Sequence, residues 1–240
     1  MNQDVIDTLG AVRREVKACE RDGRPARAVI AERTYDTSVA DVWDALTNAE
    51  RLPRWFAPVT GDLRLGGRYQ IEGNAGGEVV ACDAPTHLAL TWEFGGGTSW
   101  LDVVLTEAGD AGTLLRLEHV APLHDPGAPQ GPDMWDQFGP GAVGIGWDLS
   151  LLGLGEHLRT GEDVAAAGEA ALLGEDGPAY MAVAGDGWYA AEVASGTCED
   201  DARGRADRTV AFYSGEGPGV EDLMAGHEGG EGGGEGDAPG

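Results

Sequence analysis

The sequence predicts an α+β fold in which a curved antiparallel sheet wraps around one long helix. Residues 138–158 carry apolar side chains at the spacing of one helical face, and that face needs a cover. Upstream, residues 28–36 and 69–122 alternate apolar and polar side chains as strands do, with glycine-rich turns between the runs. The apolar side of such strands would cover the helix, and their polar side would face water.

The chain before the first strand predicts a short lead-in segment. Val5, Leu9, Val12 and Val16 have a modest helical spacing, which the sequence RDGRP at residues 21–25 interrupts. We therefore expect a short helix or an unstable arm at this end, followed by the strand over residues 28–36.

Two small helices are expected next. Ser38 and Asp41 have the spacing of a capping box and predict the start of a helix whose apolar face includes Val42. Asn48 is expected to cap a second, shorter helix. Pro53 should disturb this second helix, because a proline past the first turn removes a backbone donor.

The following part of the chain predicts an antiparallel meander. Its alternating stretches are centred on Tyr69, Leu90, Val103 and Leu117, and each has one apolar and one polar face. Because side chains in a strand alternate with period two, His119 should lie on the same face as Leu117.

The long helix is predicted by Val143, Trp147, Leu151, Leu154 and Leu158, which recur at steps of four, four, three and four. Glycines at its start have the pattern G-x-G-x-x-G, which in a dinucleotide-binding fold cradles a pyrophosphate. That fingerprint requires a buried strand directly before the glycines, whereas a proline-containing loop precedes them here. We interpret these glycines as positions where the helix backbone lies close to a sheet or to a bulky Trp.

Several short motifs occur in order along this part of the chain. They are Glu32-Arg33, Tyr35-Asp36-Thr37, residues 42–47 (VWDALT), Trp55-Phe56, residues 61–67 (GDLRLGG), Thr91-Trp92, Gly112-Thr113, Glu118-His119 and residues 144–151 (GIGWDLSL). In this order they resemble the START-like SRPBCC superfamily, and within it the group named for activators of the heat-shock protein 90 ATPase. The resemblance implies the helix-grip (START/Bet v-like) fold, with a mainly apolar cavity between the sheet and the long helix.

The chain divides into four predicted regions. Residues 1–26 form the lead-in segment and residues 27–161 the START-like domain. Residues 162–213 form a helical extension similar to that of actinobacterial members, with short helices near residues 188–196 and 202–213 that pack on the domain. Residues 214–240 contain seven acidic residues, eleven glycines and no Lys or Arg, so we expect a disordered acidic tail.

Composition limits the possible partners. A net charge of -26 argues against nucleic acid and anionic membrane surfaces, which bind clustered Lys and Arg. Cys19, Cys82 and Cys198 lie far apart, and the five histidines show no ligand spacing, so neither a disulfide framework, a metal site nor a cofactor is predicted. We expect a cytoplasmic protein with reduced thiols.

The candidate site is the space between the sheet and the long helix. Side chains expected to line it are Tyr69, Leu90, Trp92, Val103, Leu117, His119, Val143, Trp147 and Leu151. His119 is the polar member. We favour a core-edge histidine that is hydrogen-bonded to backbone, and keep a ligand-contacting acid or base as the alternative.

The sequence predicts a protein that binds an apolar or amphipathic small molecule by burial. No catalytic residue is assigned, because there is no G-x-S-x-G elbow and Ser150 lies among apolar residues on the helix. Two alternatives stay open. One is an interaction module for a chaperone ATPase or a transcriptional regulator, and the other is an enzyme resembling polyketide cyclases and aromatases.

Overall fold

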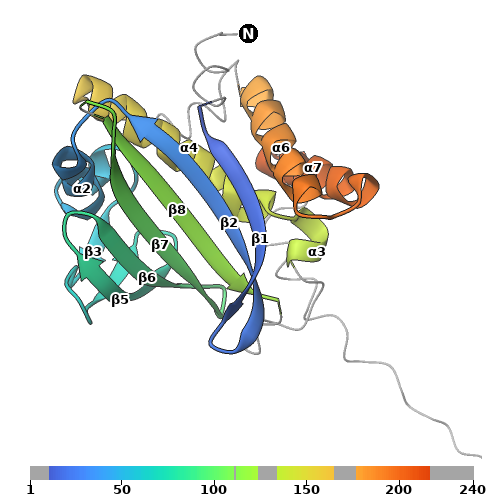
Figure 1. Cartoon of the computed structure of the whole chain (residues 1–240), viewed down its shortest axis with the longest axis horizontal. Helices are drawn as coiled ribbons and strands as arrows, with labels where there is room; N and C mark the ends of the chain where they lie inside the picture. Colours follow the sequence, from blue (N-terminus) through green and yellow to red (C-terminus); the bar gives the residue numbers. More distant parts are fainter. Residues whose placement is uncertain (1–10, 111, 124–133, 165–176, 217–240) are drawn as a thin grey trace, which may run out of the picture.

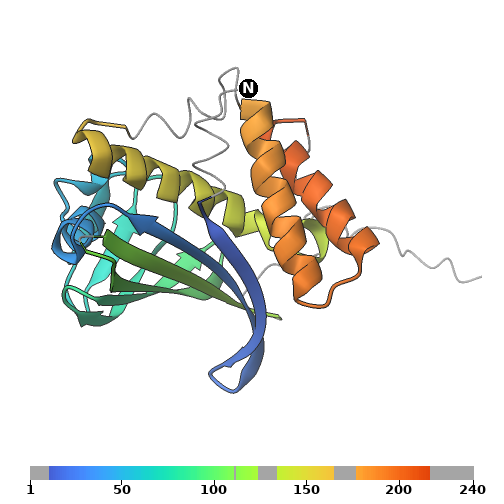
Figure 2. The ribbon, with the colours of Figure 1, turned by 45° about the horizontal axis from the view of Figure 1, so that its top comes forward.

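An eight-stranded antiparallel sheet and the helix α4 that crosses its concave face form the centre of the protein (Figures 1 and 2). The computed structural model describes residues 11–110, 112–123, 134–164 and 177–216. The strand order is β1-β2-β8-β7-β6-β5-β4-β3, and every neighbouring pair is antiparallel. The predicted α+β class and its sheet wrapped on a long helix are confirmed.

The elements have the following bounds. The strands are β1 Arg13–Arg21, β2 Arg24–Tyr35, β3 Val59–Gly61, β4 Arg68–Ile71, β5 Gly76–Asp83, β6 His87–Phe94, β7 Gly97–Ala108 and β8 Gly112–Pro122. The helices are α2 Val39–Thr47, the 3₁₀ helix η1 Leu52–Arg54, α3 Met134–Phe138, α4 Gly141–Thr160, α6 Gly177–Ala194 and α7 Glu199–Tyr213.

The register of β6, β7 and β8 brings the inward-facing residues into rows. His119 of β8 lies opposite Leu101 of β7, and Leu117 lies opposite Val103. Trp92 of β6 lies opposite Ser99 of β7. Burial alternates strictly along β8 from Thr113 to His119, as the period-two pattern predicts.

The two small helices between β2 and β3 are anchored by local hydrogen bonds. Ser38 caps α2 by accepting a hydrogen bond from the backbone N–H of Asp41 at 3.3 Å, as the capping pattern predicts. The second helix is a single 3₁₀ turn that has Pro53 in its first positions. Trp55 donates from Nε1 to the carbonyl oxygen of Ala45 at 2.9 Å and so connects the two helices.

The predicted helix near the start of the chain is wrong over its described part. Residues 13–21 form the edge strand β1, which pairs with β2 from Arg13↔Glu32 to Arg21↔Arg24. The sheet therefore begins well before residue 27. Val12 and Val16 are both buried, because a spacing of four residues places two side chains on one face of a strand as well as of a helix.

The helices beyond the long helix pack on α4 and on β1, beside the sheet (Figure 2). α6 begins eleven residues before the predicted position, and α7 is close to its predicted bounds. Trp188 of α6 is 1 % exposed and lies against Gly144 of α4, where a Cβ atom would overlap the indole ring. The glycine pattern at the start of α4 is thus a packing feature, as we interpreted it. The predicted tail lies outside the described residues from residue 217 onward.

Candidate functional site

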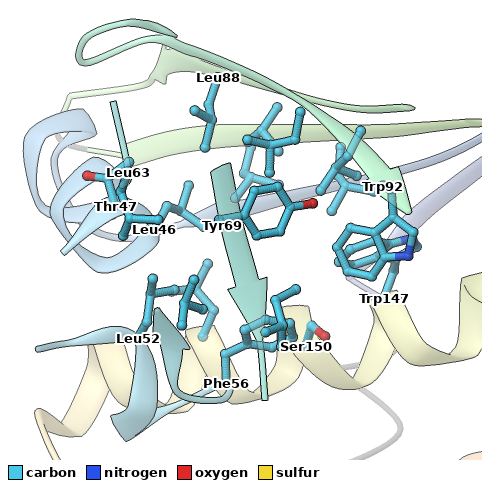
Figure 3. Close-up of a pocket in the computed structure, with 18 of the residues that line it drawn as sticks. Leu46, Thr47, Leu52, Phe56, Leu63, Tyr69, Leu88, Trp92, Trp147 and Ser150 are labelled. Atoms are coloured by element: carbon cyan, nitrogen blue, oxygen red, sulfur yellow. The ribbon is translucent and has the colours of Figure 1, made fainter. Parts of the chain in front are cut away.

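The main cavity lies between the sheet, α2, η1 and α4 and has a volume of about 130 Å³ (Figure 3). Its walls are almost entirely aliphatic and aromatic side chains from these elements. None of the described residues that line it carries a charge. A cavity of this composition favours an apolar occupant, because burying an ion without a partner costs several kcal/mol or more.

Most of the predicted cavity residues lie in its wall. Those that do are Tyr69, Leu90, Trp92, Val103, Leu117, Trp147 and Leu151. Val143 does not line the cavity and is 36 % exposed. It lies one turn before Trp147 at the start of α4. Helical spacing gives the direction of a side chain around the axis, but not how far along the axis the sheet extends.

The prediction missed the part of the wall that comes from the small helices and the segment after them. These residues are Leu46, Thr47, Leu52, Trp55, Phe56, Val59 and Leu63. The sequence predicted an apolar face for the first of these helices, but it did not assign that face to the cavity wall. Ser150 of α4 also lines the cavity, and its hydroxyl is the polar group that α4 contributes to the wall.

Three rings form one end of the cavity wall and its support. Trp92 and Trp147 meet edge to face, with their ring centroids 5.2 Å apart. The imidazole of His119 lies behind them, 5.8 Å from each ring. His119 is 4 % exposed and is not part of the cavity wall. Such edge-on arrangements are favourable for aromatic pairs.

A chain of hydrogen bonds fixes the tautomer of His119. Trp147 donates from Nε1 to Nδ1 of His119 at 3.1 Å, so Nδ1 carries no proton. The ring proton is therefore on Nε2, which donates to Ser99 Oγ at 2.8 Å. Ser99 donates in turn to the carbonyl oxygen of Trp92 at 3.3 Å. Every polar atom in this chain has a partner when the imidazole is neutral.

Protonation of His119 is disfavoured at this position. Burial lowers the pKa of His119 to about 4. A proton added to Nδ1 would also point at the N–H of Trp147, and Nδ1 could then no longer accept the hydrogen bond that Trp147 donates. His119 is thus a hydrogen-bonded core histidine, as favoured from the sequence, but its partners are two side chains instead of backbone. From behind the cavity wall, it holds Trp147 in place within that wall.

The hydroxyl groups of the cavity wall already donate to backbone. Tyr69 Oη donates to the carbonyl oxygen of Thr91 at 2.7 Å, and Ser150 Oγ donates to that of Gly146 at 2.9 Å. Thr47 Oγ1 donates to the carbonyl oxygen of Trp43 at 2.8 Å. Burial raises the pKa of Tyr69, so its hydroxyl stays neutral. Each oxygen keeps lone pairs with which it can accept a further hydrogen bond.

A second buried polar group lies on the opposite side of α4, away from the cavity. Asp148 is fully buried and pairs with Arg14 of β1 at 3.1 Å. Trp188 of α6 donates from Nε1 to Asp148 Oδ2 at 3.0 Å. Burial raises the pKa of Asp148 to about 6, against the opposing effects of Arg14 and Trp188. These contacts connect β1, α4 and α6 and serve the fold.

Metal ligands do not gather anywhere in the described ranges, where no three His, Cys, Asp or Glu side chains are close enough to hold an ion. His87 contacts Asp83 and Asp102, and His157 contacts Arg51 and the carbonyl oxygen of Glu162. Among the helices that the structure describes, none is long and apolar enough to cross a membrane.

Comparison with known protein families identifies the family to which the chain belongs. The family model described as Activator of Hsp90 ATPase homolog 1-like protein matches residues 36–159, which are 124 of the 240 residues. The chain belongs to this family. The SRPBCC superfamily and the group expected from the sequence motifs are therefore confirmed, and with them the helix-grip fold.

Solved structures agree with this assignment. The solution structure of CalU16 from Micromonospora echinospora is 31% identical in sequence to this chain. The match spans 77% of this chain and 97% of the CalU16 chain, with a TM-score of 0.60. Its crystal structure is 29% identical, with coverages of 78% and 99% and a TM-score of 0.59. A conserved protein of unknown function from Enterococcus faecalis, EF2215, is 16% identical, covers 66% of this chain and 84% of its own, and has a TM-score of 0.51, so it shares the fold. No curated protein matches the chain.

Proposed function

We propose that this protein binds a small apolar or amphipathic molecule in the cavity between the sheet and α4, by burial and without covalent chemistry. The observation that carries the proposal is the cavity wall, which is uncharged and almost wholly apolar. SRPBCC proteins bind small hydrophobic ligands, and this chain has the family's fold. Apolar surface removed from water contributes about 25 cal/mol per Å² to such binding.

The packing of the surrounding core supports a pre-formed site. Leu115 and Leu154 in the cavity wall are at most 1 % exposed, and Trp147 is held by His119. A site whose walls are already ordered loses little entropy when a ligand enters. Cys19, Cys82 and Cys198 are free thiols, which fits our proposal of a cytoplasmic location.

The proposal is tested by native mass spectrometry of the purified protein, followed by extraction of any bound molecule and calorimetric titration with it. Leu90→Trp should remove binding, because Leu90 is a half-buried wall residue and the larger ring would occupy the cavity. Val80→Trp is the matched control. Val80 of β5 is 41 % exposed, so the same bulk is added outside the cavity. Equal binding by both variants would place the ligand elsewhere.

The same experiment separates the two alternatives. If the protein is an interaction module for a chaperone ATPase or a regulator, the wild type and the Leu90→Trp variant should bind the partner equally well. A cyclase or aromatase-like enzyme should release a changed product from a polyketide or aromatic substrate, and Leu90→Trp should stop the turnover. The uncharged cavity wall is the reason that we place simple binding first.

A further inference from the structure

The cavity has two chemically different ends. Figure 3 shows the hydroxyl of Tyr69 pointing toward Trp92 and Trp147, with Ser150 on the same side. Hydrogen bonding and sequence agree, because Tyr69 donates to Thr91, the residue before Trp92, and Ser150 lies about one turn from Trp147 on α4. We name this region the tryptophan end. The opposite region, the leucine end, is formed by Leu46, Leu52 and Leu63, together with Thr47.

The tryptophan end offers more acceptors than donors. The protons of Tyr69 and Ser150 are engaged with backbone carbonyl oxygens, so both hydroxyl oxygens offer lone pairs. The indole N–H groups of Trp55 and Trp147, which also line the cavity, are engaged with Ala45 and His119. This end therefore provides two hydroxyl oxygens that can accept a hydrogen bond.

We infer that the tryptophan end takes a neutral hydroxyl group of the ligand, with the apolar body directed toward the leucine end. This inference rests on the proposed function. A phenol or alcohol has a hydroxyl proton that it can donate to the oxygen of Tyr69 or Ser150. A carboxylate has no proton to donate. It would face the lone pairs of the two hydroxyl oxygens in a cavity wall that has no positive charge. The cavity should therefore select alcohols and phenols over acids of equal size.

The test uses three ethyl-substituted benzenes at pH 7: ethylbenzene, 4-ethylphenol and 4-ethylbenzoate. Cavities of a comparable volume hold benzene. Calorimetry measures each Kd for the wild type and for the variant with both Tyr69→Phe and Ser150→Ala. We expect the wild type to bind 4-ethylbenzoate at least about tenfold more weakly than 4-ethylphenol. The ratio of the ethylbenzene Kd to the 4-ethylphenol Kd should fall about threefold to tenfold in the double variant.

Thr47→Val is the matched control. Its hydroxyl also lines the cavity and donates to backbone, but it lies at the leucine end. It should change the three affinities by a common factor and keep the ratio. Ser150→Ala alone, with its fold checked by circular dichroism, repeats the test if the double variant does not fold.

The possible failures are distinct. If ethylbenzene binds but the ratio is unchanged in the double variant, or if 4-ethylbenzoate binds as tightly as 4-ethylphenol, the inference is overturned and the proposed function stands. If none of the three probes binds the wild type, the proposed function is overturned and the inference with it.

Discussion

At the scale of single residues, His119 is a buried histidine whose tautomer is fixed by its hydrogen bonds. Its two nitrogens are occupied by Trp147 and Ser99, and this arrangement is satisfied only by the neutral ring. The sequence placed His119 on the inner face of β8 but could not show which atoms it would contact. Those partners come from β7 and α4, which only the tertiary fold brings together.

His119 should make the stability of the protein fall in acid. Its pKa is about 4 in the folded protein and about 6.5 when unfolded, so the unfolded state binds the extra proton first as the pH falls. The stabilisation is complete above pH 6.5 and is lost progressively down to pH 4, by about 3 kcal/mol at most. In urea titrations His119→Gln should show a smaller loss over this window than the wild type. Equal losses in the two proteins would contradict the assignment.

At the scale of whole elements, hydrophobic periodicity predicted which side chains face inward more reliably than it predicted whether a segment is a helix or a strand. The alternation in β6, β7 and β8 gave no competing pattern, and four of the seven predicted residues that line the cavity lie on these strands. β1 was missed because Val12 and Val16 fit both periods. The inner face of α4 was found from Trp147 to Leu154. Its second buried face, where Gly144 and Asp148 contact α6, was not found, because glycine and aspartate form no apolar stripe.

The second face of α4 predicts opposite effects for two neighbouring glycines. Gly144→Ala should lower the free energy of unfolding by about 1–3 kcal/mol, because the new methyl group overlaps the ring of Trp188. At Gly146 the nearest atom to an added Cβ is Tyr213 Oη at 3.5 Å, an ordinary contact. Gly146→Ala should therefore be neutral or stabilise the protein by up to about 1 kcal/mol through helix propensity. Denaturant unfolding of both variants measures this, and a larger loss at Gly146 would refute it.

At the scale of the whole molecule, the polar contacts around Asp148 join three regions that the sequence presented as separate. Arg14 comes from the predicted lead-in, Asp148 from the domain and Trp188 from the extension. Their distance along the chain concealed the contact, since residues 14 and 148 have no common local pattern. The family match covers only residues 36–159, yet the described extension shares its core with them.

This shared core predicts that α6 and α7 unfold together with the sheet. Trp188→Ala removes a fully buried indole and leaves Asp148 with Arg14 alone, so it should cost about 3–5 kcal/mol. Tyr189→Ala is the matched control on the same helix. Tyr189 is half-buried and stacks on Arg203, whose guanidinium lies 3.8 Å from the ring centroid, so its loss should cost about 1 kcal/mol.

Urea unfolding followed by circular dichroism distinguishes the two arrangements. A wild type with one transition, which Trp188→Ala shifts to lower urea with an unchanged m-value, is the result expected for a single cooperative unit. An extension that is merely attached would give a separate early transition, because its helices would lose their structure before the sheet does. In that case Trp188→Ala would change the early transition alone and leave the midpoint of the sheet where it was. Because Trp188 lies against Gly144 and donates to Asp148 on α4, we expect the shift to affect the whole curve.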